Sequence, residues 1–126
     1  MARVLVVDDD EDIRGLVSMR LKAAGHRVVA VGDGNAALAL VEERGLPEVA
    51  VLDVSMPGMD GFQLVQALRG LGGSDVRVVF LSARVQEHDV ARGREVGATY
   101  LTKPFIASAL INAVERSTPV GADDVW

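Results

Sequence analysis

The sequence predicts a single α/β domain in which one parallel sheet is covered by helices on both faces. Three observations support this prediction. Short runs of almost wholly apolar, often β-branched residues recur along the chain, and such runs are typical of strands buried on both faces. Each run precedes a segment with apolar residues at helical spacing. The runs begin roughly 22 to 28 residues apart, a length typical of successive βαβ units.

The first unit shows both patterns clearly. The predicted strand Arg3–Val7 stops at three aspartates, Asp8 to Asp10. Apolar residues then recur every three or four positions from Asp12 onward: Ile13, Leu16, Val17, Leu21 and Ala24. This spacing predicts an amphipathic helix, and Gly25 after it is a natural C-terminal cap.

The same pair of patterns predicts four further units. Two of them are strand Arg27–Val31 with helix Asn35–Glu43, and strand Val49–Leu52 with helix Gly61–Arg69. The last two are strand Arg77–Leu81 with a helix near Gln86–Val96, and strand Thr99–Leu101 with a helix near Ile106–Glu115. A closed barrel of eight such units would need about twice this length, so the sheet is predicted to be open.

Turn residues mark the boundaries between these elements. Pro57-Gly58 suits the central pair of a type II turn, and Asp60 can cap the helix that follows. Residues 117–126 contain proline and glycine but no periodicity, so they are predicted to be a linker or a disordered tail. The domain itself is expected to span residues 1–116.

Composition and charge exclude several classes of protein. The chain has 126 residues, 49% of them hydrophobic, so it can form a core without disulfides, and the absence of cysteine excludes thiol catalysis and thiolate zinc sites. Thirteen Lys and Arg against eighteen Asp and Glu argue against direct nucleic-acid binding by this domain. The sequence shows neither a signal peptide nor an apolar run of membrane-spanning length, and we expect a cytoplasmic protein with no membrane association.

Polar residues lie where the predicted strands end. Asp8, Asp9 and Asp10 follow the first strand, and Asp53, Ser82 and Lys103 end the third, fourth and fifth strands. In a parallel sheet these ends meet along one edge, where ligands of such folds bind. Clustered carboxylates repel one another unless a cation offsets them, which predicts Mg²⁺. An aspartate in such a cluster can accept a phosphoryl group, with Mg²⁺ and a lysine stabilising the charge.

Four motifs in order give the chain a resemblance to a known family. They are the acidic pair Asp8-Asp9, Leu52-Asp53 followed by Met56-Pro-Gly-Met-Asp-Gly61, Ser82-Ala83, and Lys103-Pro104-Phe105. Over residues 3–116 the chain resembles the receiver domains of two-component response regulators, the CheY-like superfamily. The resemblance implies a three-layer, doubly wound (βα)₅ sandwich of the flavodoxin-like type, with five parallel strands in the order 2-1-3-4-5.

The resemblance also implies a role for each site residue. Asp53 would accept a phosphoryl group from a sensor histidine kinase or a histidine phosphotransfer protein. Asp9, Asp53 and the backbone carbonyl of Ser55 would bind Mg²⁺, and Asp8 would hold a metal-bound water. Lys103 would pair with the phosphorylated aspartate. Ser82 would turn toward the phosphoryl oxygen, and Tyr100 would change rotamer with it. The protein would thus be a signalling switch rather than an enzyme acting on other substrates.

Further expectations concern the surface that signals. The resemblance implies that the fourth helix, fifth strand and fifth helix form the output surface, which meets an effector domain or protein and can form a homodimer. Gly93 would weaken the fourth helix, consistent with a movable element. The bond Lys103-Pro104 would be cis. Ser55 and Arg84 depart from residues frequent in the family at positions that tune the lifetime of the phosphorylated state.

Several alternatives stay open on sequence alone. Asp8-x-Asp10 also resembles the start of haloacid dehalogenase phosphatases, in which the first aspartate is the nucleophile. A flavodoxin-like FMN binder and a receiver that no longer accepts phosphate are two others. Asp8 to Asp10 could also be a solvated charge run that caps the first helix. His26 reads as a surface or structural residue. The chain is either a stand-alone receiver or the N-terminal piece of a longer regulator.

Overall fold

A computed structural model describes residues 2–73, 75–82 and 98–116 of the chain. These residues contain one parallel sheet of five strands in the order β2-β1-β3-β4-β5. Its strands are β1 (Arg3–Val7), β2 (Arg27–Val31), β3 (Val49–Asp53), β4 (Arg77–Ser82) and β5 (Thr99–Thr102). Both the parallel sheet and the strand order expected from the resemblance are confirmed.

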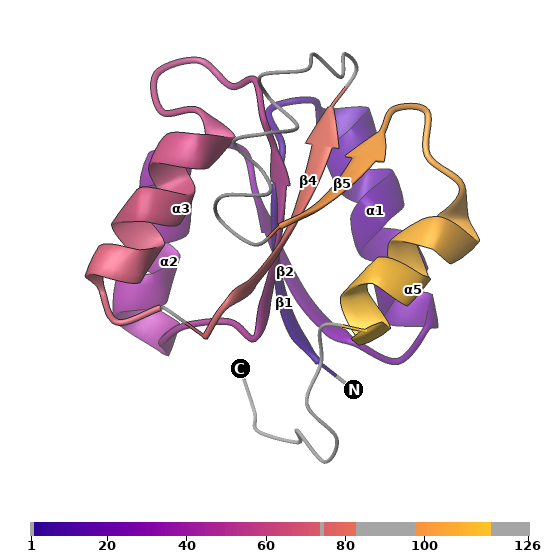
Figure 1. Cartoon of the computed structure of the whole chain (residues 1–126), viewed down its shortest axis with the longest axis horizontal. Helices are drawn as coiled ribbons and strands as arrows, with labels where there is room; N and C mark the ends of the chain where they lie inside the picture. The colour runs from indigo at the N-terminus through magenta and orange to yellow at the C-terminus, as the bar shows by residue number, and fades with distance from the viewer. Residues whose placement is uncertain (1, 74, 83–97, 117–126) are drawn as a thin grey trace.

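The described helices cover both faces of this sheet. They are α1 (Glu11–Ala23), α2 (Gly34–Arg44), α3 (Gly61–Gly70) and α5 (Ala107–Arg116). Helices α2 and α3 lie on one face and α1 and α5 on the other, so the molecule has three layers (Figure 1). The helix predicted near Gln86–Val96, with Gly93, lies outside the described residues, as do Arg84 and the predicted tail 117–126.

Each face of the sheet has its own hydrophobic core. Alternate strand residues such as Leu5, Leu52 and Phe80 pack with α2 and α3, while Val6, Val51 and Val79 pack with α1 and α5. All five residues of β3, the central strand, are buried. The nearly all-apolar composition of the predicted strands is therefore explained, because their side chains enter a core on either side.

Capping side chains set where the helices begin. The predicted starts at Asp12 and Asn35 are each one residue too late. Asp10 and Asp33 are the N-caps, so α1 starts at Glu11 and α2 at Gly34. Asp60 caps α3, as predicted, and forms a reciprocal capping box with Gln63. The last helix instead begins one residue later than Ile106, at Ala107.

Two glycines have the backbone conformation that the turn predictions require. Gly58 has a φ of 80°, as the third residue of a type II turn must, and Gly25, which follows the C-cap Ala24 of α1, has a φ of 96°. The predicted ends of three strands are each one residue too early: β3 includes Asp53, β4 includes Ser82 and β5 includes Thr102. The apolar runs stop where the side chains become polar, but the strand ladder continues through the register pairs Asp53↔Leu81 and Ser82↔Thr102.

His26 is a structural residue and not a surface one. Its ring is buried, and Nδ1 accepts a hydrogen bond from the backbone N–H of Ala2 at 3.0 Å. Nε2 lies 3.4 Å from a carboxylate oxygen of Glu115 in α5. His26 directly precedes β2, so the imidazole joins the start of β1 to the end of α5 at the amino ends of the strands.

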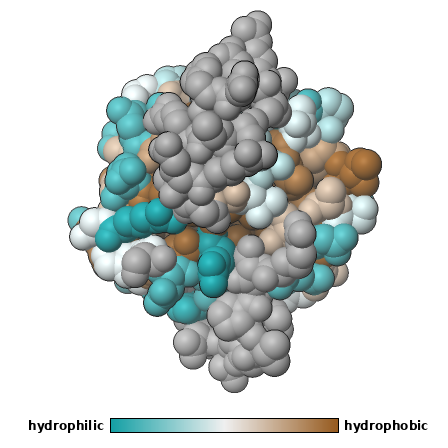
Figure 2. Space-filling view, in the orientation of Figure 1, coloured by the Kyte–Doolittle hydropathy of each residue, from teal (hydrophilic) through white to brown (hydrophobic). Residues whose placement is uncertain are grey.

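The surface mixes hydrophilic and apolar residues. Figure 2 shows apolar surface at the right of the view, on the side where Figure 1 places α5. Ile106, directly before this helix, is the most exposed of the large apolar side chains among the described residues, at 71%. Within the same described ranges, no helix combines the length and the apolar character needed to cross a membrane.

Candidate functional site

The predicted carboxylates do meet at the carboxyl edge of the sheet. β1 and β3 are neighbours, and Val7 lies opposite Leu52. Asp8 and Asp53, the next residue of each chain segment, therefore lie side by side. Carboxylate oxygens of Asp8, Asp9 and Asp53 lie within 4.8 Å of one another. Asp8 and Asp53 are buried and Asp9 is exposed. The group is therefore anchored in the core on one side and open to solvent on the other.

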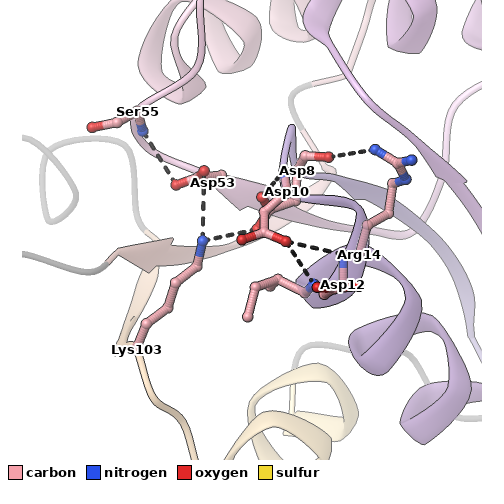
Figure 3. Close-up of polar contacts among 8 residues, drawn as sticks. Asp8, Asp10, Asp12, Arg14, Asp53, Ser55 and Lys103 are labelled. Carbon is pink, nitrogen blue, oxygen red and sulfur yellow. Dashed lines mark hydrogen bonds and ion pairs between the residues drawn. The ribbon is translucent and has the colours of Figure 1, made fainter.

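Lys103 joins two of these carboxylates. It extends from the loop after β5, and its ammonium nitrogen lies 2.9 Å from Oδ2 of Asp8 and 3.5 Å from Oδ2 of Asp53 (Figure 3). The backbone N–H of Lys103 donates to the carbonyl of Ser82 at 2.7 Å, which continues the contact between β4 and β5. The peptide bond Lys103-Pro104 is cis, as the resemblance implied.

Burial makes ionisation of Asp53 costly. Desolvation, followed by repulsion from Asp8, raises the pKa of the Asp53 carboxyl from 3.8 to about 6, although Lys103 and the hydrogen bond from the Ser55 N–H oppose the shift. That hydrogen bond reaches Oδ1 of Asp53 at 3.3 Å. Lys103 and this hydrogen bond therefore offset only part of the effect of burial and of Asp8.

Lys103 stays charged despite its partial burial. Desolvation alone would lower the pKa of its ammonium group, but the hydrogen bond to Asp8 and the charges of Asp53 and Asp8 raise it above 10.5. Its side chain is only 14% exposed. The site therefore holds a permanent cation beside the two buried carboxylates.

The residues of the cluster fit a magnesium ion. Carboxylate oxygens are hard ligands of the kind that Mg²⁺ binds, commonly one or two per ion with waters and a phosphate completing the shell. Three carboxylates lie together and one ammonium group contacts two of them, so the charge of the group favours a further cation. The backbone carbonyl of Ser55, an expected ligand, belongs to an exposed residue two positions after Asp53.

The acidic run after β1 divides into two roles. Asp10 caps α1, because its carboxylate accepts hydrogen bonds from the N–H groups of Asp12 and Ile13. The alternative reading of this run as a helix cap is thus right for Asp10. It is wrong for Asp8, whose buried carboxylate accepts from the N–H of Asp10 at 2.9 Å and pairs with Lys103.

Ser82 and Tyr100 lie on the neighbouring strands. Ser82 is buried at the end of β4, one residue beyond Leu81, the register partner of Asp53. Tyr100 lies opposite Phe80, with ring centroids 5.8 Å apart. Because side chains alternate along a strand, Phe80 and Ser82 share one face of the sheet, and Tyr100 shares it with them. The two expected switch residues therefore lie on the same face.

One contact of the site was not predicted from the sequence. The Arg14 guanidinium, in α1, donates to the backbone carbonyl of Asp8 at 3.0 Å (Figure 3). Arg14 falls between the apolar positions that define the predicted helix, where a charged residue normally faces solvent. The sequence places Arg14 one helical turn after the aspartates, but an arginine at this spacing is too common to predict the contact.

Comparison with known proteins agrees with this geometry. A family model described as the response regulator receiver domain matches residues 4–115. The chain belongs to this family of receiver domains. It is 42% identical over 114 residues to the transcriptional regulatory protein PrrA of Mycobacterium tuberculosis, which covers 90% of this chain. It is 37% identical over 113 residues to the DNA-binding response regulator MtrA of Mycolicibacterium smegmatis, which covers 89%.

A solved structure resembles the receiver domain along its whole length. The chemotaxis protein CheY4 of Vibrio cholerae superposes with a TM-score of 0.86 and 36% identity, covering 94% of this chain and 99% of that one. The chain spans only 48% of the length of PrrA and of MtrA. These relatives give the receiver domain a role in a two-component phosphorelay. The haloacid dehalogenase alternative is not favoured.

Proposed function

We propose that Asp53 is the phosphoacceptor of this receiver domain. The observation that supports this assignment is the position of Asp53 at the end of the central strand, buried beside Asp8 and 3.5 Å from the ammonium group of Lys103. A carboxylate there can be approached by a phosphoryl group from the solvent side, where Asp9 is exposed. Lys103 is placed to balance the charge that the phosphoryl oxygens bring.

The chemical step is a transfer of one phosphoryl group. An ionised carboxylate oxygen of Asp53 attacks phosphorus, and the bond from phosphorus to the imidazole nitrogen of the donor phosphohistidine breaks. The electron pair of that bond stays on the imidazole, and an acyl phosphate forms on Asp53. With acetyl phosphate as donor, the leaving group is acetate. Because the pKa of Asp53 is about 6 without metal, most of this carboxyl is ionised at pH 7.

Three groups of the chain would hold the metal cofactor. We assign Asp9, Asp53 and the backbone carbonyl of Ser55 as Mg²⁺ ligands, with Asp8 holding a metal-bound water. When bound, Mg²⁺ supplies positive charge that offsets the repulsion between the carboxylates and the incoming phosphoryl oxygens. Lys103 already neutralises part of this charge through its contacts with Asp8 and Asp53.

Ser82 and Tyr100 would carry the signal away from Asp53. The Ser82 hydroxyl would hydrogen-bond a phosphoryl oxygen, and Tyr100 would change rotamer on the same sheet face. β5 and α5 would then form the described part of the output surface. The fourth helix would be the third part of the output surface. A homodimer or an effector would contact it.

The partners are proposed at the level of class. A sensor histidine kinase or a histidine phosphotransfer protein would supply the phosphoryl group, and an effector domain or protein would receive the signal. The relatives PrrA and MtrA are about twice as long as this chain, so an effector could belong to the same protein. We propose that this domain itself contacts neither nucleic acid nor membrane. We place it in the cytoplasm, where such phosphodonors are made.

We propose no catalysis beyond self-phosphorylation and dephosphorylation. In a haloacid dehalogenase phosphatase, Asp8 would be the nucleophile. Here one Asp8 oxygen accepts the Asp10 N–H and the other contacts Lys103, both at 2.9 Å, within a buried side chain. Burial and repulsion from Asp8 raise the pKa of Asp53 to about 6, as expected for a carboxyl group that Mg²⁺ binding would ionise fully.

Intact mass after incubation with acetyl phosphate tests the assignment. We expect the wild type to gain one phosphoryl group only when Mg²⁺ is present, and Asp53→Asn to gain none. Asp33→Asn, an exposed helix cap outside the cluster, is the matched control and should behave like the wild type. Phosphate on Asp8 with turnover of phosphomonoesters would instead indicate a phosphatase. A bound yellow flavin, or no phosphate on any residue, would also contradict the proposal.

A further inference from the structure

Arg14 contacts the main chain of the site rather than a carboxylate. Its Nη1 donates to the carbonyl oxygen of Asp8 at 3.0 Å, and the side chain reaches there from the second turn of α1 (Figure 3). Arginine is protonated at all working pH values, so the contact is a charge-assisted hydrogen bond to a carbonyl. The bond is partly buried, because Asp8 is buried and Arg14 is half-buried.

Gly32, just after β2, leaves room for this guanidinium. A Cβ atom on Gly32 would lie 3.0 Å from Nη1 and 3.8 Å from Cζ of Arg14, and no other heavy atom would lie within 4 Å of it. The φ of Gly32 is not in the left-handed region, so its backbone would accept alanine. Among the described residues, Arg14 is therefore the neighbour that a side chain at position 32 would crowd.

The remaining polar groups of Asp8 are also engaged. Its N–H donates to the carbonyl of Val31 at 3.3 Å, one carboxylate oxygen accepts from the Asp10 N–H, and the other pairs with Lys103. The carbonyl held by Arg14 belongs to the planar peptide that joins Asp8 to Asp9. If this peptide plane is held, the orientation of the backbone at Asp9 is held as well. Asp9 carries the exposed carboxylate of the cluster.

We propose that Arg14 is a positioning residue for Mg²⁺ in this receiver domain. It holds the peptide between Asp8 and Asp9 so that the oxygens of both carboxylates face Asp53. This inference rests on the proposed function, in which the same carboxylates bind the ion. Arg14 itself touches neither the metal nor the phosphoryl group in this scheme.

Whether Mg²⁺ binds more tightly or more weakly without Arg14 distinguishes a positioning role from a purely electrostatic effect. A fixed cation near a cation site repels the ion, so removing its charge should tighten Mg²⁺ binding if charge alone matters. Loss of a residue that orients ligands weakens binding, by about tenfold or more for typical outer contacts of metal sites. Arg14→Gln therefore gives opposite results under the two explanations.

Isothermal titration of the metal-free, full chain with MgCl₂ makes the measurement. We expect Arg14→Gln to raise the Mg²⁺ dissociation constant about tenfold, and Arg14→Lys, which retains a charged donor, to raise it less. Gly32→Ala keeps the arginine and its charge but displaces it, so it should also weaken binding. In the Arg14→Gln background, Gly32→Ala should have no further effect. Arg20→Gln, an exposed arginine in the last turn of α1, is the matched control.

Two further readouts keep the outcomes distinct. The amide shifts of Asp9 and Asp10 should change in metal-free Arg14→Gln, and its thermal unfolding shows whether the variant is folded. If Arg14→Gln does not fold, Gly32→Ala provides the test. Unchanged or tighter Mg²⁺ binding in the folded variants overturns the inference. A wild type that binds no Mg²⁺ and accepts no phosphate overturns the proposed function itself, and the inference with it.

Discussion

At the scale of single residues, the site has more negative than positive charge at the carboxyl edge of the sheet. Asp8 and Asp53 are both buried, and Lys103 is the cation that contacts them in the described part of the chain. Desolvation, together with repulsion from Asp8, raises the pKa of Asp53 although Lys103 lowers it. The site therefore gains from any further cation, which explains how the same residues can bind a metal and then a phosphoryl group.

Asp53 should make the metal-free protein less stable as pH rises. The pKa of its carboxyl is about 6 in the folded protein and 3.8 for an ordinary aspartate, so the stabilisation of the folded state by the bound proton is complete below pH 3.8 and is lost as pH rises through 6. Asp53→Asn removes this loss. We expect the variant to be more stable than the wild type by about 1–2 kcal/mol at pH 7 in EDTA.

Urea unfolding of both proteins from pH 4 to pH 8 measures this difference. The advantage of Asp53→Asn should shrink toward pH 4, where the wild-type carboxyl is protonated. Adding Mg²⁺ at pH 7 should stabilise the wild type and leave the variant nearly unchanged, because a ligand stabilises only the form that binds it. An advantage that is constant with pH would show that Asp53 does not titrate in this range.

Removing Lys103 should raise the pKa of Asp53 further. Lys103 lowers that pKa through its charge 3.5 Å away, so Lys103→Met leaves burial and Asp8 unopposed. We expect the carboxyl carbon of Asp53, followed by NMR, to titrate above pH 6 in the variant. Phosphorylation by acetyl phosphate at pH 7 should slow about 100-fold, because charge stabilisation on the phosphoryl oxygens is lost as well. Lys22→Met, an exposed lysine in the last turn of α1, should leave both measurements unchanged.

At the scale of elements, the sequence predicted each described strand and helix but misplaced the ends that matter most for the site. Apolar periodicity ends where a side chain becomes polar, so Asp53 and Ser82 fell just outside the predicted strands. Backbone pairing does not depend on side-chain polarity, and the ladder includes both residues. The contact of Arg14 with Asp8 escaped prediction for a related reason, because helical spacing does not show which polar residue turns inward.

The join between β3 and α3 depends on a glycine. A Cβ atom on Gly61 would lie 2.6 Å from the carbonyl oxygen of Asp53, 3.1 Å from Cα of Val54 and 3.2 Å from a ring carbon of Phe80. Two of these atoms are backbone and cannot rotate away. We expect Gly61→Ala to destabilise the fold by about 1–3 kcal/mol in urea unfolding and to lower the rate of Asp53 phosphorylation by displacing the end of β3.

Gly15→Ala is the matched control for this substitution. Gly15 lies inside α1, is exposed, and has no heavy atom within 4 Å of the position of an added Cβ. Alanine there should stabilise the protein by about 0.5–1 kcal/mol, because it restricts the unfolded chain and favours the helix. Destabilisation by both substitutions would contradict the steric explanation for Gly61.

At the scale of the whole molecule, two cores on opposite faces of one sheet hold the site at their common edge. Strands that are apolar on both faces required helices on both sides, so this layering was predictable from residue patterns. The strand order was not, because neither spacing nor composition indicates that β2 lies outside β1; the family resemblance supplied it. The cores also support the proposed domain boundary, since their residues extend from Ala2 to Val114.

A chain that ends at residue 116 should therefore fold and accept phosphate like the full chain. Truncation there keeps the two cores, the contact between His26 and Glu115, and the site residues from Asp8 to Lys103. We expect its unfolding free energy to lie within about 0.5 kcal/mol of the full-length value, as for changes outside packed or capped positions. Its phosphorylation rate with acetyl phosphate and Mg²⁺ should be unchanged. A less stable or inactive truncated chain would show that residues 117–126 belong to the domain, because the retained cores would then be insufficient to hold the edge on which Asp53 lies.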